Sequence, residues 1–117
     1  MKGAIAYHSG AAAEDQVARH YARMGHSVTA RRWRGQSGEI DLVFRGPDGL
    51  IFTEVKCAST HAIAAERLSE RQMWRIMSAA SEFVASEADG QDSAMRFDVA
   101  LVDRRGRIEI IPNALGH

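Results

Sequence analysis

Residues 38–56 read GEIDLVFRGPDGLIFTEVK, and this stretch decides the fold. Apolar and polar residues alternate over residues 40–45, and a second extended pattern resumes over residues 50–55. Such alternation is typical of β-strands. Between the two runs, residues 46–49 are Gly, Pro, Asp and Gly, which favour a tight turn. The stretch therefore predicts an antiparallel β-hairpin.

The turn also predicts which residues face one another across the hairpin. If it is centred between its proline and its aspartate, residues whose numbers sum to 95 are partners, so Asp41 lies opposite Glu54. By the same rule Glu39 lies opposite Lys56. Partners of this kind have Cβ atoms about 4.5 to 5.5 Å apart, and side chains alternate along a strand, so all four would share one face. A bulge in the turn would shift this register by one residue and disperse the group.

The rest of the chain predicts two helices and three further strands. Helical spacing of apolar residues, extended runs and turn residues place these elements in order: a helix over 9–24 with Ser9 as N-cap and Gly25 as its stop, a strand over 26–33, a helix over 69–86, a loop over 87–93, a strand over 96–102, and a strand over 107–111 ended by Pro112. With the hairpin included, the order is α-β-β-β-α-β-β.

This order predicts an α/β fold in a single domain over residues 1–117. A helix between an antiparallel hairpin and a later strand implies a crossover connection, and hence a mixed five-stranded sheet with a helix on each face. The run over 96–102 is nearly continuously apolar, which predicts a strand buried on both faces in the centre of the sheet.

The composition is that of an ordinary folded domain, with 117 residues, of which 45% are hydrophobic and 26% charged. Fifteen basic and fifteen acidic residues give zero net charge, which argues against a uniformly basic surface. No stretch has the roughly 18 consecutive apolar residues of a membrane-spanning helix, and the N-terminus lacks the apolar run of an export signal. The only cysteine, Cys57, cannot form an intramolecular disulfide and is expected to be a small core residue. The sequence therefore predicts a cytoplasmic protein without a membrane partner.

The hairpin acids predict a cation site. Asp41 and Glu54 side by side repel each other unless a proton or a cation lies between them. Carboxylate oxygens at that separation suit Mg²⁺ or Mn²⁺, which can activate water and neutralise charge on a phosphodiester. Lys56 would point at the same place, where its two candidate roles are to orient the attacking water and to stabilise the charge that develops on the phosphate. The alternative is that these residues, with Glu39, form a solvated face whose ion pairs contribute at most about 1 kcal/mol each.

Arginines supply nearly all the positive charge, because Lys2 and Lys56 are the only lysines. Three arginines, Arg31, Arg32 and Arg34, lead directly into the hairpin and are expected to contact phosphates, with Trp33 available to stack on a base or sugar. The arginines at 19 and 23 are expected on an exposed helix face. Trp74 and the methionines of the second helix are expected in the core.

The motifs Gly38-Glu39-Ile40-Asp41-Leu42-Val43 and Phe52-Thr53-Glu54-Val55-Lys56 resemble the D...ExK signature of the PD-(D/E)XK nuclease superfamily. From Gly10 to about Val102 the chain also resembles the bacterial YraN-like family, a group related in fold to archaeal Holliday-junction resolvases. The resemblance implies a restriction-endonuclease-like, three-layer α/β/α core.

The same resemblance implies roles for individual residues. Asp41 and Glu54 would be metal ligands, Lys56 the catalytic lysine, and Glu14 a glutamate on the first helix that completes the site. Gln72 occupies a position where relatives often carry lysine, which places it among the candidate phosphate contacts.

The sequence therefore predicts a Mg²⁺- or Mn²⁺-dependent endonuclease that hydrolyses phosphodiester bonds in DNA, with branched and single-stranded DNA as candidate substrates. The alternative is a non-catalytic nucleic-acid-binding or assembly module that keeps the nuclease fold. A third hypothesis is a protein-interaction domain whose acidic patch is structural. DNA is favoured over RNA as partner, and a homodimer is compatible with relatives that act on two-fold junctions.

Overall fold

The computed structural model describes residues 2–87 and 94–114, with side chains from residue 10 onward. Its elements follow the chain in this order: α1 (Lys2–Arg23), β1 (Ser27–Arg34), β2 (Glu39–Gly46), β3 (Gly49–Cys57), α2 (His61–Glu66), α3 (Glu70–Ala85), β4 (Met95–Val102) and β5 (Ile108–Ile111). The predicted order is confirmed, with the short helix α2 as an addition. The predicted loop over 87–93 lies, after its first residue, outside the described part.

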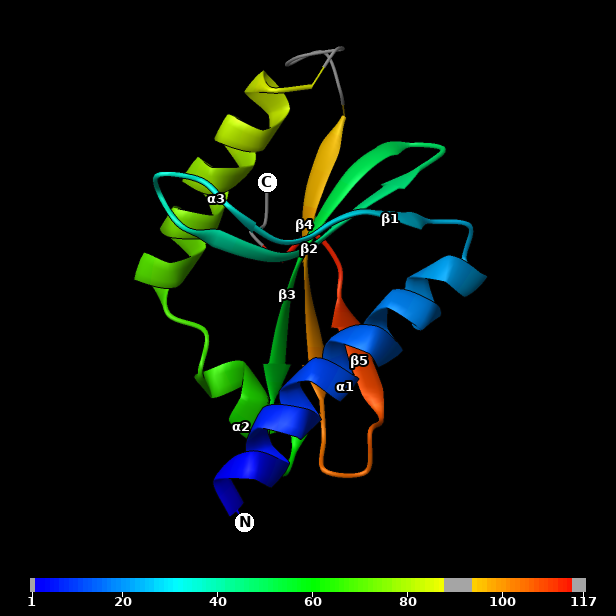
Figure 1. The fold of residues 1–117 in the computed structure, drawn as a ribbon, viewed down its shortest axis with the longest axis vertical. Helices are drawn as coiled ribbons and strands as arrows, with labels where there is room; N and C mark the ends of the chain where they lie inside the picture. The colour runs from blue at the N-terminus through cyan, green and yellow to red at the C-terminus, as the bar shows by residue number, and fades with distance from the viewer. Residues whose placement is uncertain (1, 88–93, 115–117) are drawn as a thin grey trace.

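The five strands form one mixed sheet in the order β1-β2-β3-β4-β5. Strands β3 and β4 are parallel, and every other neighbouring pair is antiparallel. Helices α2 and α3 supply the crossover that parallel pairing requires. In Figure 1, β1 and β2 run across the view whereas β4 runs along it, so the sheet is strongly twisted. The central strand is β3, so the expectation that the 96–102 run is central is wrong by one position, although β4 is an interior strand.

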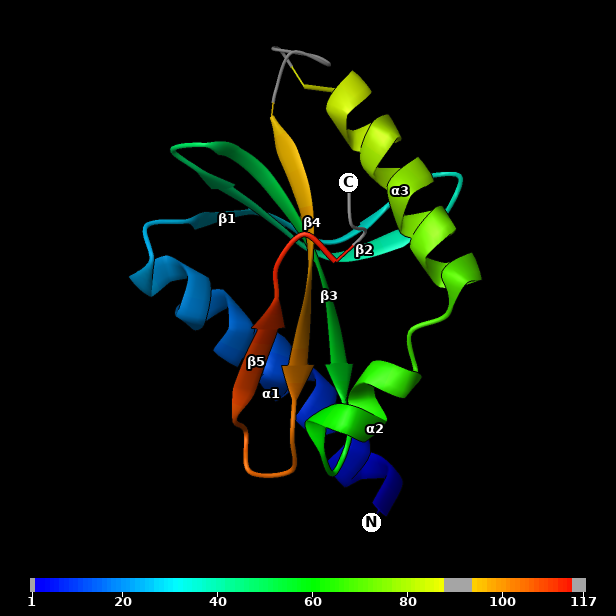
Figure 2. The same cartoon turned by 180° about the vertical axis from the view of Figure 1, so that it is seen from behind.

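Each face of the sheet is covered by a helix, as predicted. On one face the Tyr21 ring of α1 stacks on Phe44, with ring centroids 4.2 Å apart. On the other face Phe83 of α3 meets Phe52 edge to face at 5.7 Å. Figures 1 and 2 show α1 on one side of β4 and β5, which lie in front of it when the molecule is turned. Strand β4 contributes buried residues to clusters on both faces, which confirms its predicted double burial.

Local capping explains where the helices end. Gly25 has a φ of +88°, and His26 N–H and Gly25 N–H donate to the carbonyls of Tyr21 and Ala22. This is the Schellman arrangement that glycine favours, so the predicted stop is confirmed. Ser69 caps α3 by accepting from Gln72 N–H at 3.1 Å.

Two expectations about the helices are wrong. Ser9 is not an N-cap, because α1 already begins at Lys2. Trp74 is not a core residue, because its exposed fraction is 66%. The buried face of α3 contains Ile76, and two residues of helix turn Trp74 by about 200° away from it.

The hairpin has the predicted register over most of its length. Partners run from Gly46 opposite Gly49 to Leu42 opposite Thr53, and the turn is the two residues between the glycines. Gly49 has a φ of +122°, and a Cβ there would lie 2.3 Å from the Ala94 carbonyl oxygen. A side chain at this position would therefore collide with the start of β4.

A buried carboxylate on β4 links this strand to α1 and to the turn that follows β5. Asp98 is 2% exposed and accepts the Tyr21 hydroxyl proton at 2.6 Å. It also accepts from the Arg96 guanidinium at 3.1 Å and from Asn113 N–H at 3.0 Å. A buried charge is tolerated only when it is paired and hydrogen-bonded. Loss of any one of these donors should therefore lower the free energy of unfolding.

We expect Tyr21→Phe to lower the free energy of unfolding by about 1 to 3 kcal/mol, because it removes a donor from a buried charged acceptor. Urea denaturation followed by circular dichroism measures the change. The control is Ser27→Ala, which removes an exposed hydrogen bond to Arg45 O and should change stability by less than about 0.5 kcal/mol. Equal changes in the two variants would contradict the assignment.

Candidate functional site

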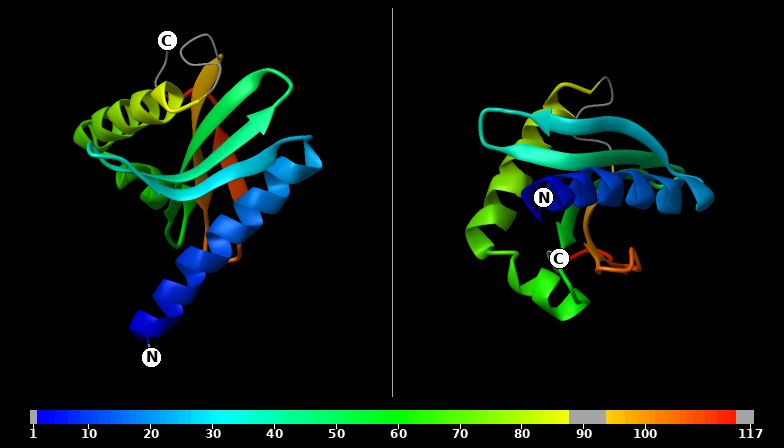
Figure 3. Two further views of the ribbon diagram at one scale, coloured as in Figure 1. Left: turned by 45° about the horizontal axis from the view of Figure 1, so that its top comes forward. Right: turned by 60° about the horizontal axis from the view of Figure 1, so that its bottom comes forward.

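A hollow of about 380 Å³ lies where α1, β2, β3 and α3 meet. Its lining includes every residue predicted to be catalytic, together with three other polar side chains: Glu14, Glu39, Asp41, Glu54, Lys56, Gln72 and Arg75. Figure 3 shows α1 and α3 on either side of the strands that carry the hairpin motifs. The fold thus gathers residues that are up to about sixty positions apart in the chain.

Asp41 lies where β2 separates from β3. The ladder between the two strands ends at Leu42 opposite Thr53, and the next N–H of β3 to be satisfied, that of Val55, donates to Asp41 Oδ2 at 2.8 Å. A side-chain carboxylate therefore replaces a ladder bond. On the other edge of β2, Arg32 lies between two paired residues of β1 and has a φ of +46°. Such a conformation is uncommon for a residue other than glycine and often occurs at functional sites.

The predicted cross-strand pairs are not formed as ladder partners, because the ladder stops before Asp41. Glu39 is paired with Arg34 of β1, both in the strand register and through a side-chain bond of 3.0 Å. The physical reason is that β2 follows β1 as it leaves β3. Glu39 nevertheless lines the same hollow as Lys56.

Glu54 is the most buried acid of the hollow, with 6% of its surface exposed. Gln72 Nε2 donates to Glu54 Oε2 in a short hydrogen bond, and Lys56 Nζ lies 3.5 Å from the same oxygen. Burial and the adjacent Asp41 carboxyl raise the pKa of Glu54 well above its ordinary value, whereas Lys56 lowers it. The Lys56 side chain is only 19% exposed. The alternative of a solvated hairpin face is therefore wrong for both Glu54 and Lys56.

Glu14 enters the hollow from α1, as the resemblance implied. Its Oε1 accepts from Arg32 Nε at 3.2 Å. Burial raises the pKa of Glu14, the hydrogen bond from Arg32 lowers it, and the negative charges of Asp41 and Glu39 raise it further. The charges of Asp41 and Glu39 therefore act on Glu14, and the charge of Asp41 also acts on Glu54.

The three arginines predicted to contact phosphates are each joined to an acidic side chain. Their ion pairs are Arg31 with Asp15 at 2.9 Å, Arg32 with Glu14 at 3.2 Å, and Arg34 with Glu39 at 3.0 Å. All three guanidinium groups are about half exposed or more. Exposed pairs of this kind contribute about 1 kcal/mol or less, so a phosphate can compete for the arginines.

A support for the hollow was missed in the sequence. Glu82 of α3 accepts from Gln36 N–H at 2.9 Å and from Ser37 N–H at 3.0 Å, in the loop between β1 and β2. Gly38, the next residue, packs against Arg75, where an added Cβ would lie 3.3 Å from the arginine Cβ. In the sequence, the helical period indicates only that Glu82 lies on a helix. Its contact with the loop between β1 and β2 could not be predicted from that.

The donor set fits a magnesium-type cation. The hydrogen bonds from Val55 and Gln72 engage Asp41 Oδ2 and Glu54 Oε2, and these two carboxylates are the groups that would hold a cation. In the part of the chain that the structure describes, no group of three or more His, Cys, Asp or Glu side chains is arranged to hold a metal ion. Mg²⁺ typically takes one or two carboxylates together with waters and phosphates, and Asp41 and Glu54 offer two carboxylates in this hollow.

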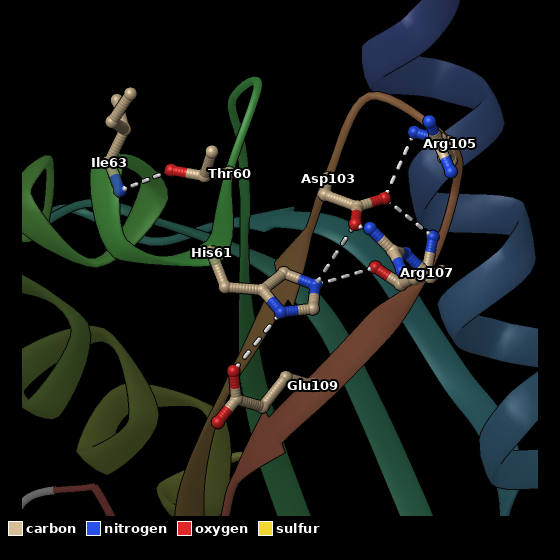
Figure 4. A network of polar contacts seen from close by, with 7 residues as sticks. All are labelled: Thr60, His61, Ile63, Asp103, Arg105, Arg107 and Glu109. Atoms are coloured by element: carbon tan, nitrogen blue, oxygen red, sulfur yellow. Dashed lines mark hydrogen bonds and ion pairs between the residues drawn. The ribbon is translucent and has the colours of Figure 1, made fainter.

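A second polar cluster lies beyond the end of β3 (Figure 4). His61, the first residue of α2, has Nε2 2.9 Å from the Arg107 carbonyl oxygen and Nδ1 3.1 Å from Glu109 Oε2. Asp103 accepts from Arg105 N–H and Arg107 N–H, both at 2.9 Å. These contacts fasten α2 to the turn between β4 and β5, so the cluster has a structural role.

Among the residues from 2 to 87 and from 94 to 114, none of the helices is both long and apolar enough to span a bilayer. Cys57 is half-buried and packs against the cluster that includes α1, on the face opposite Lys56, so its predicted core position is confirmed only in part.

Comparison with known proteins places the chain among close relatives. A UPF0102 protein of Cereibacter sphaeroides (strain KD131) is 60% identical over 114 residues, covering 97% of each chain. A second, of Ruegeria pomeroyi, is 55% identical over 93% of this chain and 89% of its own, and a third, of Dinoroseobacter shibae, is 44% identical over 96% and 84%. The model of the "Uncharacterised protein family UPF0102" matches residues 13–102. The resemblance to the YraN-like group is thereby confirmed, and the chain belongs to the UPF0102 family.

Proposed function

We propose that this protein is a divalent-metal-dependent endonuclease of the PD-(D/E)XK type that hydrolyses phosphodiester bonds in DNA. The observation that carries the proposal is the convergence of Asp41, Glu54 and Lys56 on one hollow in which Glu54 is nearly fully buried. Gathering two carboxylates and an ammonium in a partly buried place costs desolvation free energy. Such clusters are typical of catalytic sites.

Asp41 and Glu54 would hold Mg²⁺ or Mn²⁺, which when bound supplies a Lewis acid for the phosphate and acidifies a water. The protein's own part is to keep the two carboxylates in place. Val55 N–H fixes Asp41, and the Gln72 amide fixes Glu54. Both donors belong to the protein itself, one to the backbone of β3 and the other to a side chain of α3.

Lys56 would stabilise the charge that develops on the phosphate oxygens during hydrolysis. Its ammonium is 3.5 Å from Glu54 Oε2 and lines the hollow, so it lies beside the group that would hold the cation. Glu14 would complete the site from α1, where it lies against Arg32.

Arg31, Arg32 and Arg34 would contact the phosphates on either side of the bond that is cut, by exchanging their exposed carboxylate partners for phosphate oxygens. Gln72 would act differently from a phosphate contact, since its amide is bound to Glu54. Gln72 places no positively charged side chain at this position of α3, where a nuclease would use one to contact phosphate. A non-catalytic nucleic-acid-binding module could do without that charge, so this module is the second candidate.

We expect Asp41→Asn and Lys56→Met each to lower metal-dependent cleavage by at least about 100-fold, because each removes a charge from the reacting centre. The assay compares duplex, flap, junction and single-stranded DNA with Mg²⁺ or Mn²⁺. Asparagine keeps an oxygen that can accept from Val55 N–H, so Asp41→Asn should remain folded.

The matched control is Glu66→Gln, which removes an exposed carboxylate at the end of α2 and should leave cleavage unchanged. Cutting that persists in both Asp41→Asn and Lys56→Met would sink the proposed site. Binding of DNA without cutting on every substrate would instead favour the non-catalytic module.

We also expect Mn²⁺ to raise the melting temperature of the natural protein and to do so much less in Asp41→Asn and Glu54→Gln. The physical reason is that a ligand that binds only the folded state stabilises it by mass action. Differential scanning calorimetry at matched ionic strength measures the effect, with Ca²⁺-free buffer and Glu66→Gln as control. An equal rise in all variants would show that the cation binds elsewhere.

A further inference from the structure

The outward surface of α3 carries an aromatic side chain between basic ones. Trp74 is 66% exposed, the largest exposed fraction of any large hydrophobic residue in the described part of the chain. Arg71 and Arg75 are exposed as well. A single exposed apolar residue is ordinary, but an exposed tryptophan flanked by arginines offers a flat ring and two positive charges together.

Spacing along α3 places these side chains in a row. Residues three and four apart are neighbours on a helix surface, so Arg71 is adjacent to both Trp74 and Arg75. Arg75 lines the hollow and lies against Gly38. The row therefore begins at the candidate site with Arg75, continues through Arg71, and ends at Trp74 on the face opposite the core.

The charges of this row are available, in contrast to those of β1. Within residues 10–87 and 94–114, neither Arg71 nor Arg75 forms an ion pair, whereas Arg31, Arg32 and Arg34 each bind an acidic side chain. Glu70, the first residue of α3, lies next to Arg71 in the chain but forms no ion pair with it in the described structure, and Glu82 is engaged with the loop before β2. The row thus has the positive charge that a phosphate backbone requires.

We propose that Arg75, Arg71 and Trp74 bind a single-stranded segment of DNA next to the candidate site, with Trp74 stacked on an unpaired base. This inference rests on the proposed function and names its substrate class. In a duplex the bases stack on one another, so only an unpaired base can present its face to the Trp74 ring. The arginines then hold the phosphates on the site side of that base.

The experiment titrates the metal-free protein with oligothymidylate and with a duplex of the same length, following tryptophan fluorescence. The other tryptophan, Trp33, is half-buried and meets Phe83 edge to face at 5.4 Å, so it should respond less. We expect the single strand to quench the emission and the duplex to quench it much less. In Trp74→Leu the quenching is lost and affinity for the single strand falls by about 10-fold, whereas duplex affinity stays within about two-fold.

Two further variants separate stacking from charge. Trp74→Phe keeps an aromatic face and should recover much of the single-strand affinity. The double variant Arg71→Gln/Arg75→Gln should weaken binding of both DNA forms and lower the slope of log affinity against log salt by about one to two. All substituted side chains are exposed, so circular dichroism melts should match those of the natural protein.

The outcomes distinguish this inference from the proposed function. Equal losses for single strand and duplex in Trp74→Leu, or no loss, would overturn the inference while cleavage by the natural protein left the nuclease proposal intact. Quenching and preference for the single strand without any cleavage would support the inference and sink the catalysis. Preference for oligouridylate over oligothymidylate, or a dimer in sedimentation that Trp74→Leu dissociates, would overturn it in favour of RNA or of a second copy of this chain.

Discussion

The hydrogen bond from Val55 N–H to the Asp41 carboxylate is the interaction on which the candidate site depends. A backbone N–H at a half-buried position of a central strand must have a partner, and in a regular hairpin that partner would be a carbonyl of β2. Because Asp41 takes this role with its side chain, β2 can leave β3 and stay with β1. The separation opens the space into which Glu54 and Lys56 project.

The same separation creates an electrostatic problem that the neighbouring residues offset. Glu54 is buried close to Asp41, and the charge of Asp41 also acts on Glu14. Lys56 and Gln72 stabilise Glu54 from one side, and Arg32 stabilises Glu14 from the other. These contacts moderate the repulsion, but burial and the adjacent Asp41 carboxyl still keep the pKa of Glu54 raised. A proton or a cation is still needed between the carboxylates.

The hairpin was readable from the sequence because two strong local rules apply to it. Period-two alternation and a glycine-flanked turn fix both the strands and their register, and the membership of Asp41, Glu54 and Lys56 in one site follows from them. The end of the ladder was not readable, because a side chain there replaces a backbone partner. Helix α2 was missed because six residues give too little periodicity.

Long-range charge pairing was the other unreadable part. Phosphate contact by the arginines before the hairpin stays a prediction, and their ion pairs could not be read from the sequence. The pairs with Asp15 and Glu14 depend on how α1 lies against β1, and the pair with Glu39 depends on how β1 pairs with β2. Trp74 was assigned to the core by its residue type, whereas the helical period places it opposite Ile76. The position of Trp74 was therefore readable from the helical period, whereas the ion pairs of the arginines required the three-dimensional arrangement.

The zero net charge acquires a physical meaning from these pairs. It does not reflect evenly spread charge, because acids gather in the hollow and arginines surround them. An exposed ion pair contributes about 1 kcal/mol or less, whereas a guanidinium can bind a phosphate through two parallel hydrogen bonds. Exchange of partners would therefore carry only a small penalty, and would return Glu14 and Glu39 to the hollow as free carboxylates when a phosphate arrives. Under the proposed function, a divalent cation would offset this added negative charge, so binding of DNA and binding of metal would strengthen each other.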